Sequence, residues 1–218
     1  MERETQLKRK RGRPASRQEL NIDEVLEVAI DVFAEKGFAG AQLKEIAERA
    51  GISKSLMNYH FQNKEELWKK AVKKLEEKLT NRLREAKGYF KDLSGVALMK
   101  AYNRQFIYFS ADQPAFYKIL FHEMCARSER SEWLIQTILQ PIYSFSEVLL
   151  EAAKEDNAQI GKIPVANLAG ILMGAANAFF IHAFQMQEMY GVNPFAPDQI
   201  ERHADIVNEL VFGHLDNL

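Results

Sequence analysis

The sequence predicts an all-α protein with about nine helices. Apolar residues recur at helical spacing from residue 21 onward, and no stretch alternates as a β-strand would. The 218 residues contain only 6 prolines and 11 glycines, too few for a turn-rich β architecture. Pro114, Pro164 and Pro197 each stand where the first turn of a helix accepts proline.

Four helices are predicted in the first third of the chain, each with its own start or stop signal. Asn21 and Asn63 are each followed three residues later by glutamate, which is the spacing of a capping box. Gly51 and Ser53 separate the second helix from the third, since glycine accepts a sharp turn and serine caps the next helix. The expected ranges are 21–37, 43–50, 54–60 and 63–88.

Five further helices are expected at 93–110, 114–127, 131–154, 164–190 and 197–215. The apolar region 163–184 is interrupted by polar residues, so a buried core helix is favoured over a membrane span. We expect three parts: a basic disordered arm at 1–17, a helix-turn-helix domain at 18–68 and a larger helical domain at 69–218.

Composition narrows the class of protein. The formal net charge is −1, yet basic residues crowd the first seventeen positions, where they could attract phosphates. Cys125 is the only cysteine, so no disulfide forms within the chain and a reducing cytoplasm fits. The sequence shows no phosphate loop, nucleophile elbow or zinc-ligand spacing, so we expect no enzyme, cofactor or metal. His122 lacks the spacing of a zinc helix, and His182, a lone histidine on an apolar stretch, is better explained as a core residue.

Residues 43–61 have the pattern of a helix-turn-helix. Apolar side chains fall on the side that would pack against the first helix: Ile46, Ala47, Ile52, Met57 and Phe61. The opposite side of the third helix carries Lys54, Ser55, Asn58 and Tyr59, which would be free to enter a DNA major groove.

The segment from Asn21 to Trp68, which contains this helix-turn-helix pattern, resembles the DNA-binding domain of the TetR/AcrR family of repressors. The matching segments are 32–38 (VFAEKGF), 46–53 (IAERAGIS), 59–61 (YHF) and 64–67 (KEEL). The resemblance implies that the third helix is the recognition helix. It implies DNA contacts for Lys54, Ser55, Asn58, Tyr59, His60 and Lys64.

Two positions depart from the family pattern, and the arm adds a further feature. Gln42 stands where a capping threonine is frequent, and Asn58 stands where tyrosine is frequent. Asparagine can bond to adenine through two hydrogen bonds, so base preference could differ. The run from Arg11 to Arg13 and the following proline resembles an AT-hook, whose arginines enter a narrow minor groove. A disordered tail that meets phosphates without preference is the open alternative.

The larger part of the chain is rich in aromatic residues, which core packing alone could explain. The resemblance implies in addition an effector pocket between helices, suited to a small, mostly apolar molecule. The candidate ligand-binding residues are Tyr102, Phe106, Phe121, Met124, Met173, Asn177 and Phe180. Asn177 is included because an amide on an apolar helix needs a polar partner.

The last two predicted helices are apolar on wide faces. The resemblance implies that they pair two copies into a homodimer that reads a palindromic operator. The alternative is that they cover the core of a single copy. The whole sequence therefore predicts a bacterial, cytoplasmic and nucleoid-associated repressor that an effector releases from DNA. An activator, an effector-independent regulator and a helical ligand-binding protein with vestigial DNA binding are the alternatives.

Overall fold

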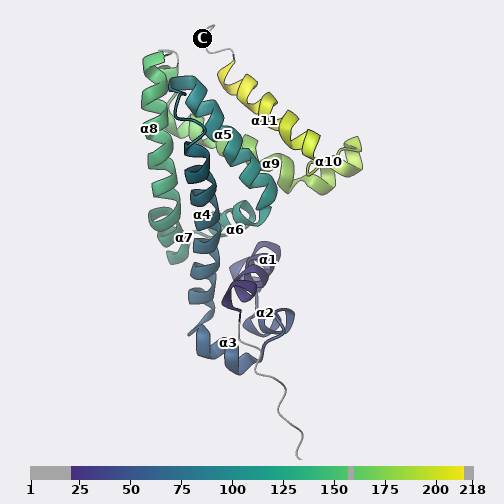
Figure 1. Cartoon of the computed structure of the whole chain (residues 1–218). Helices are drawn as coiled ribbons and strands as arrows, with labels where there is room; N and C mark the ends of the chain where they lie inside the picture. Colours follow the sequence, from purple (N-terminus) through teal and green to yellow (C-terminus); the bar gives the residue numbers. More distant parts are fainter. Residues whose placement is uncertain (1–20, 157–159, 214–218) are drawn as a thin grey trace, which may run out of the picture.

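The computed structural model describes residues 21–156 and 160–213. In these residues every regular element is a helix, which confirms the all-α prediction. The chain begins with three helices, α1 (Ile22–Gly40), α2 (Leu43–Arg49) and α3 (Lys54–His60), at the lower end of the molecule (Figure 1). The long helix α4 (Lys64–Lys87) leads from this end to the opposite one, so it belongs to both halves of the fold.

The remaining helices gather around the upper part of α4 (Figure 1). They are α5 (Gly95–Asp112), α6 (Pro114–Ala126), α7 (Glu129–Leu134), α8 (Gln140–Asp156), α9 (Val165–Ile181), α10 (Ala183–Tyr190) and α11 (Pro197–Phe212). A short 3₁₀ turn, Ile160–Lys162, precedes α9. Helix α5 packs against α4, α8, α9 and α11, so it is the centre of the larger half.

Two of the predicted helices are divided, and this is why the described residues contain α1 to α11 rather than about nine helices. The first division is a π-helical turn at Ile135–Leu139, between α7 and α8. Pro141 has no amide hydrogen to continue an α-helical ladder, and the wider turn comes immediately before it. The second division lies at His182, where α9 and α10 meet at 64°.

The termini of the first helices follow the local signals in the sequence. The Asn21 side chain accepts from the Asp23 amide at 3.1 Å, and that of Asn63 accepts from the Glu66 amide at 2.8 Å. Gly37 has a φ of +65° and kinks the last turn of α1. A Cβ atom at Gly37 would lie 3.3 Å from the His122 ring of α6, so glycine also permits close packing there.

One buried apolar cluster joins the two halves of the molecule. It includes Phe33 of α1 and Trp68 of α4, and it continues into α5, α6 and α7 through Phe109, Phe116 and Leu134. Helix α1 packs extensively on α6 and α4. The predicted boundary at residue 68 therefore lies within a continuous core, inside the second turn of α4.

Among the described residues, no single helix has the length and apolarity of a membrane span. Helices α9 and α10 reach that length only when they are taken together, across their 64° bend.

Candidate DNA-binding interface and effector cavity

Helices α2 and α3 form the helix-turn-helix that the sequence predicts. Gly51 has a φ of +67°, which an L side chain rarely adopts, so glycine makes the turn possible. The Ser53 hydroxyl accepts from the Leu56 amide at 3.1 Å and caps α3. Gln42 begins α2 without a side-chain cap, as expected from the departure at that position.

The inner face of this unit is tightly packed. Ile46, Met57 and Phe61 are almost completely buried against the rest of the cluster. The outer face of α3 presents Lys54, Ser55, Asn58 and Tyr59 to solvent. Because its inner face is held so firmly, α3 offers a rigid row of polar side chains.

Tyr59 stands out on this surface because 82% of its side chain is exposed. An aromatic ring left so open rarely serves packing. His60 is half-buried, and its ring meets that of Tyr59 edge-on at 5.0 Å. The structure thus brings five of the six described DNA-binding candidates together on α3. Arg11 and Arg13 lie outside the described residues.

Lys64, the sixth candidate, has partners within the protein. Its ammonium donates to the Ala41 carbonyl at 2.9 Å and lies 4.5 Å above the Phe38 ring. Burial lowers the pKa of this amine, and the nearby charge of Arg130 lowers it further. Lys64 therefore ties the start of α4 to the end of α1, and its contact with a phosphate stays a prediction.

Charged pairs on the surface connect α1 to α2. Arg49 donates to Glu35 at 2.9 Å and to Glu45 at 2.7 Å, and Lys36 donates to Glu45 at 2.6 Å. The hydrogen bond from Lys36 lowers the pKa of Glu45, and that from Arg49 lowers the pKa of Glu35. These pairs fix the orientation of α2, against which α3 is placed.

The turn between α6 and α7 holds the end of α1 from the other side. The Arg130 guanidinium lies over the Phe38 ring and pairs with the buried Glu123 carboxylate at 3.1 Å. Ser128 also donates to Glu123. The Phe38 ring thus contacts the cations of Lys64 and Arg130. A movement of the turn between α6 and α7 would therefore displace the end of α1.

The larger half contains a small cavity of about 100 Å³ between α4, α5, α8 and α9. It has no charged residue in its wall. Its lining is Leu79, Leu83, Met99, Tyr102, Asn103, Phe106, Ile142, Tyr143, Phe145, Ser146, Leu149, Ala169, Leu172 and Met173. Such a wall suits an apolar small molecule with one or two hydrogen-bonding groups.

Three of the seven predicted ligand-binding residues line this cavity: Tyr102, Phe106 and Met173. The other four lie elsewhere. Phe121 is 59% exposed, Met124 packs on the cluster of the N-terminal half, and Phe180 is buried against α5 and α11. Asn177 is buried, and its amide nitrogen donates to the Met173 carbonyl within its own helix.

Sequence reasoning missed the contribution of α8 and of the upper half of α4. Tyr143, Phe145 and Ser146 come from α8, and Leu79 and Leu83 continue the leucine stripe of α4. The i, i+4 leucine repeat of α4 indicated that one face of this helix is buried, but not that the face lines a cavity. The aromatic pair on α8 was the available signal.

The described helices thus define a class: a helix-turn-helix domain joined to a helical second domain that contains a cavity. Residues 25–71 match the family model described as "Bacterial regulatory proteins, tetR family". The chain is 33% identical over 102 residues to the HTH-type transcriptional regulator RutR of Escherichia coli K12, over 47% of each chain. It is 40% identical over 50 residues to the negative regulator IcaR of Staphylococcus epidermidis, over 23% of this chain and 27% of that one. The N-terminal domain of the chain is thus similar to that of TetR-family regulators.

These sequence matches span less than half the length of the curated relatives. Solved structures extend the likeness of fold to most of the chain. A TetR-like regulator from Rhodococcus sp. RHA1 superposes with a TM-score of 0.66 and 18% identity, over 90% of this chain and 96% of that one. The fatty acid degradation regulator FadR of Bacillus halodurans gives a TM-score of 0.65 at 17% identity, over 91% and 100%. At such identities the likeness concerns the fold alone.

Proposed function

We propose that the protein is a transcriptional repressor that binds a palindromic operator and is released by a small, mostly apolar effector. The observation that carries the proposal is the exposed face of α3, with Lys54, Asn58 and Tyr59 open to solvent on a tightly packed support. Side chains of these types read base edges and phosphates in the major groove. Regulation of transcription in the family whose model matches residues 25–71 supports the same conclusion.

The experiment that tests DNA binding uses the full chain and genomic fragments selected by retention at physiological salt. Tyr59→Ala is expected to weaken the binding of a selected fragment at least about tenfold, because an exposed side chain on α3 is lost. Tyr89→Ala is the matched control, since Tyr89 is 86% exposed and lies beyond the far end of α4. Equal loss in both variants, or no retained fragment, would reject the proposal.

The arm at 1–17 is proposed to add phosphate or minor-groove contacts through Arg11 and Arg13. Each phosphate contact contributes about one unit to the slope of log affinity against log salt. A chain without the arm should therefore bind with a shallower salt dependence. An unchanged slope would remove the arm from the mechanism.

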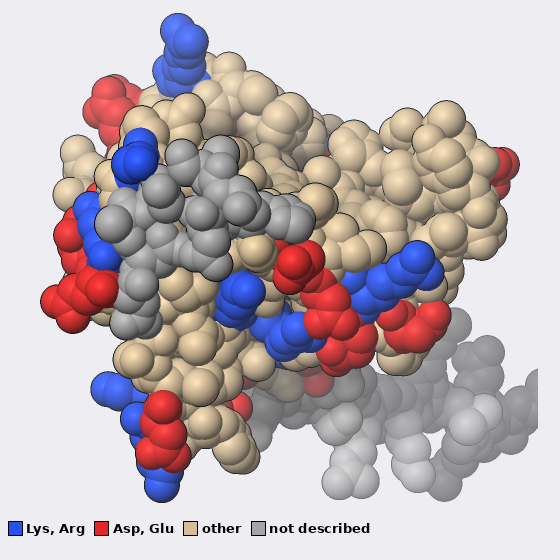
Figure 2. Space-filling model, turned by 90° about the horizontal axis from the view of Figure 1, so that it is seen from above, with Lys and Arg blue, Asp and Glu red and all other residues tan. Residues whose placement is uncertain are grey.

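The proposed dimer is formed through α9 and α11. Ile171, Ile206 and Leu210 are exposed by 54%, 44% and 71%, although they are large and apolar. A Cβ atom added at Gly170 or Gly174 would meet nothing within 4 Å, so α9 offers a smooth surface to another helix. Seen from above, the lobe at the right, where Figure 1 places α10, shows little charge (Figure 2). Exposed apolar surface of this extent favours a second copy.

Effector release is proposed to act through α4 and through the turn between α6 and α7. Leu79 and Leu83 of α4 line the cavity, while Lys64 at the start of the same helix holds α1. A ligand that binds better to one position of α4 would shift the population toward that position. The shift in operator affinity can be no larger than the difference in effector affinity between the two states. Such a regulator would act on DNA in the cytoplasm.

A further inference from the structure

Two cavities meet at one shared wall in the larger half of the protein. The inner one is the cavity of about 100 Å³ described above, called the inner chamber below. The outer one, called the vestibule, has a volume of about 410 Å³ and opens to solvent between α4 and α8. Both are lined by Leu79, Leu83, Tyr102, Ile142 and Phe145. The two spaces therefore share a wall made by these five residues.

The wall is built around two aromatic rings. The ring of Tyr102 meets that of Phe145 edge-on at 5.1 Å, and it meets Phe90 edge-on at 5.2 Å. Tyr102 is only 9% exposed, and its hydroxyl forms no hydrogen bond with the described residues. A buried hydroxyl normally has a hydrogen-bond partner. The Tyr102 hydroxyl could therefore donate to a ligand at the boundary between the two spaces. Rotation of Phe145, which is 39% exposed, would join the chamber to the vestibule.

The two spaces differ in charge. No charged residue lines the inner chamber. The vestibule is lined by two cations, Arg84 and Lys87, and by one carboxylate, Glu76. The Glu76 carboxylate already accepts from the Thr80 hydroxyl at 2.7 Å, and Arg84 uses one of its donors on Asn81 at 2.8 Å. The vestibule thus has spare hydrogen-bond donors with positive charge beside an uncharged interior.

The size of the inner chamber limits what can occupy it. Sites for small-molecule ligands usually measure about 300–1,000 Å³, so the inner chamber is too small to hold such a ligand alone. The vestibule alone would leave an apolar ligand exposed to water. An elongated molecule that spans both spaces satisfies the two conditions together.

We propose that the chamber and the vestibule together bind a single-chain amphiphile with an anionic head. Its apolar tail passes the rings of Tyr102 and Phe145 into the inner chamber, and its head pairs with Arg84 and Lys87. The Tyr102 hydroxyl donates to an oxygen near the head. This inference rests on the proposed function, because it names the chemistry of the effector that the repressor would sense.

The test measures binding to the full chain by titration calorimetry in the absence of DNA. The probes are decanoate, 1-decanol and decylamine, which share one tail and differ in head charge. Decanoate is expected to bind roughly tenfold more tightly than 1-decanol, and decylamine is expected to bind most weakly. Equal affinity for decanoate and 1-decanol would overturn the assignment of an anionic head.

Variants then locate each end of the probe. Arg84→Gln with Lys87→Gln should weaken decanoate binding about three- to tenfold and leave 1-decanol unchanged, because exposed pairs contribute modestly. The matched control is Lys73→Gln with Lys118→Gln, which changes the same charge at two other exposed positions. If decanoate affinity falls equally in both pairs, or in neither, the head does not lie in the vestibule.

Ala169→Phe fills the inner chamber from α9 and should abolish binding of decanoate and 1-decanol alike. Ser146→Phe narrows the same chamber from α8, so a folding defect in one variant leaves the other as a test. Undiminished binding in a folded chamber variant, or binding of none of the three probes by the native chain, would overturn the proposal. Because no DNA is present, these outcomes are separate from failure of the repressor hypothesis, which the Tyr59 variant addresses.

Discussion

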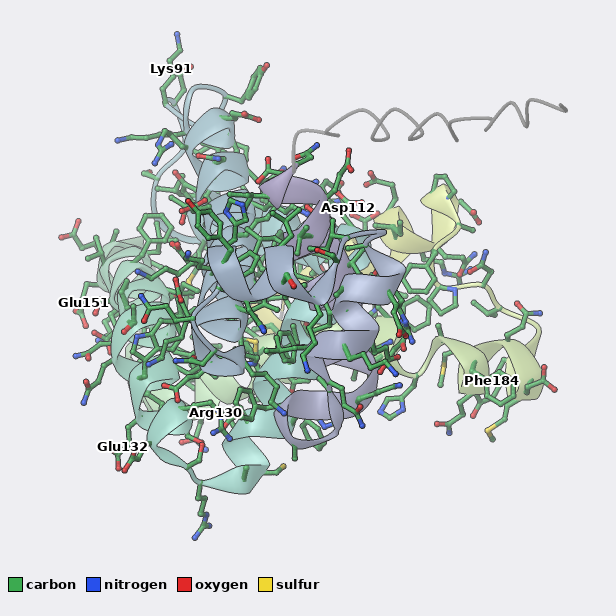
Figure 3. All side chains as sticks on the ribbon, turned by 90° about the horizontal axis from the view of Figure 1, so that it is seen from below. Lys91, Asp112, Arg130, Glu132, Glu151 and Phe184 are labelled. Carbon is green, nitrogen blue, oxygen red and sulfur yellow. The ribbon has the colours of Figure 1, made fainter. Side chains whose placement is uncertain are left out.

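The guanidinium carbon of Arg130 lies 3.7 Å from the centre of the Phe38 ring. A residue of α7 thereby holds the last turn of α1, across the junction between the two halves of the molecule. In the view from below, Arg130 lies among the helices, while Glu132 reaches outward to solvent (Figure 3). The same guanidinium is the charged partner of Glu123, whose side chain is only 3% exposed.

Removal of this cation should destabilise the protein. Arg130→Ala leaves Glu123 buried without its charged partner, and we expect the free energy of unfolding to fall by about 2–4 kcal/mol. The measurement is denaturant unfolding, with Arg202→Ala on the exposed side of α11 as the control. The double variant Glu123→Gln with Arg130→Ala should recover part of the loss. No recovery would show that the stacking on Phe38, rather than the ion pair, is the main contribution.

A pair of buried amides connects α5 to α11. The Asn103 amide donates to the Asn208 side-chain oxygen at 2.8 Å, and Asn208 donates to the Lys100 carbonyl at 3.1 Å. Asn103→Ala should cost about 1–3 kcal/mol of unfolding free energy, because the oxygen of Asn208 loses its donor. In a double-mutant cycle with Asn208→Ala the two losses should not add. Strict additivity would mean that the hydrogen bond contributes nothing.

His203 predicts a loss of stability in mild acid. Burial lowers its pKa below the usual 6.5, although its hydrogen bond with the Ala175 carbonyl at 2.9 Å opposes this shift. The unfolded chain therefore binds a proton at His203 more readily than the folded chain. Stability from this group is fully present above pH 6.5 and declines as the pH falls through that value toward the folded pKa.

His203→Gln tests this origin of the pH dependence. Glutamine keeps a donor for the Ala175 carbonyl but does not titrate, so the decline in melting temperature between about pH 7 and 5 should be smaller than in the native chain. His122→Gln on α6 is the control histidine. Identical pH profiles for native and H203Q proteins would refute the assignment.

Leu210 tests the proposed dimer. It is 71% exposed on α11, so Leu210→Glu should not disturb the monomer, yet it would place a charge in the apolar contact between two copies. Sedimentation should show a shift from about 50 kDa to the 25.0 kDa monomer. Val148→Glu, on a residue of α8 that is 66% exposed, is the control. A native chain that sediments as a monomer would reject the dimer outright.

The outer end of α10 is a further apolar surface. Phe184 is 80% exposed, and Figure 3 places it in a lobe that stands away from the other helices. The 64° bend between α9 and α10 produces this projection. The sequence predicted one helix over 164–190, because periodicity continues through His182 without a proline or glycine. The backbone of His182, with φ of −90° and ψ of 22°, leaves the helix there.

Local rules were sufficient for the helix-turn-helix. Asn21, Ser53 and Asn63 were identified as caps because an oxygen two or three atoms from the backbone can reach the free amides, whatever the rest of the fold does. The cavity depends on how α4, α5, α8 and α9 are rotated about their axes. No local pattern encodes those rotations, and this is why Tyr102 was identified while Tyr143 and Phe145 were not.

Lys64 shows a second limit of sequence reasoning. Its position at the start of α4 favoured a phosphate contact, but its ammonium lies over Phe38 and bonds to Ala41. Those partners are 26 and 23 residues away in the chain, so spacing along the sequence could not reveal them.

The length of α4 has a mechanical consequence. Leu83 in the chamber wall and Lys64 beside α1 are 19 residues apart on one helix, which corresponds to about 28 Å along its axis. A tilt of about 5° around the upper end would move the lower end by roughly 2.5 Å, many times the tolerance of a hydrogen bond. In the proposed mechanism, a displacement in the chamber hardly larger than a thermal fluctuation would therefore cause a loss of register with DNA, because a single helix is rigid.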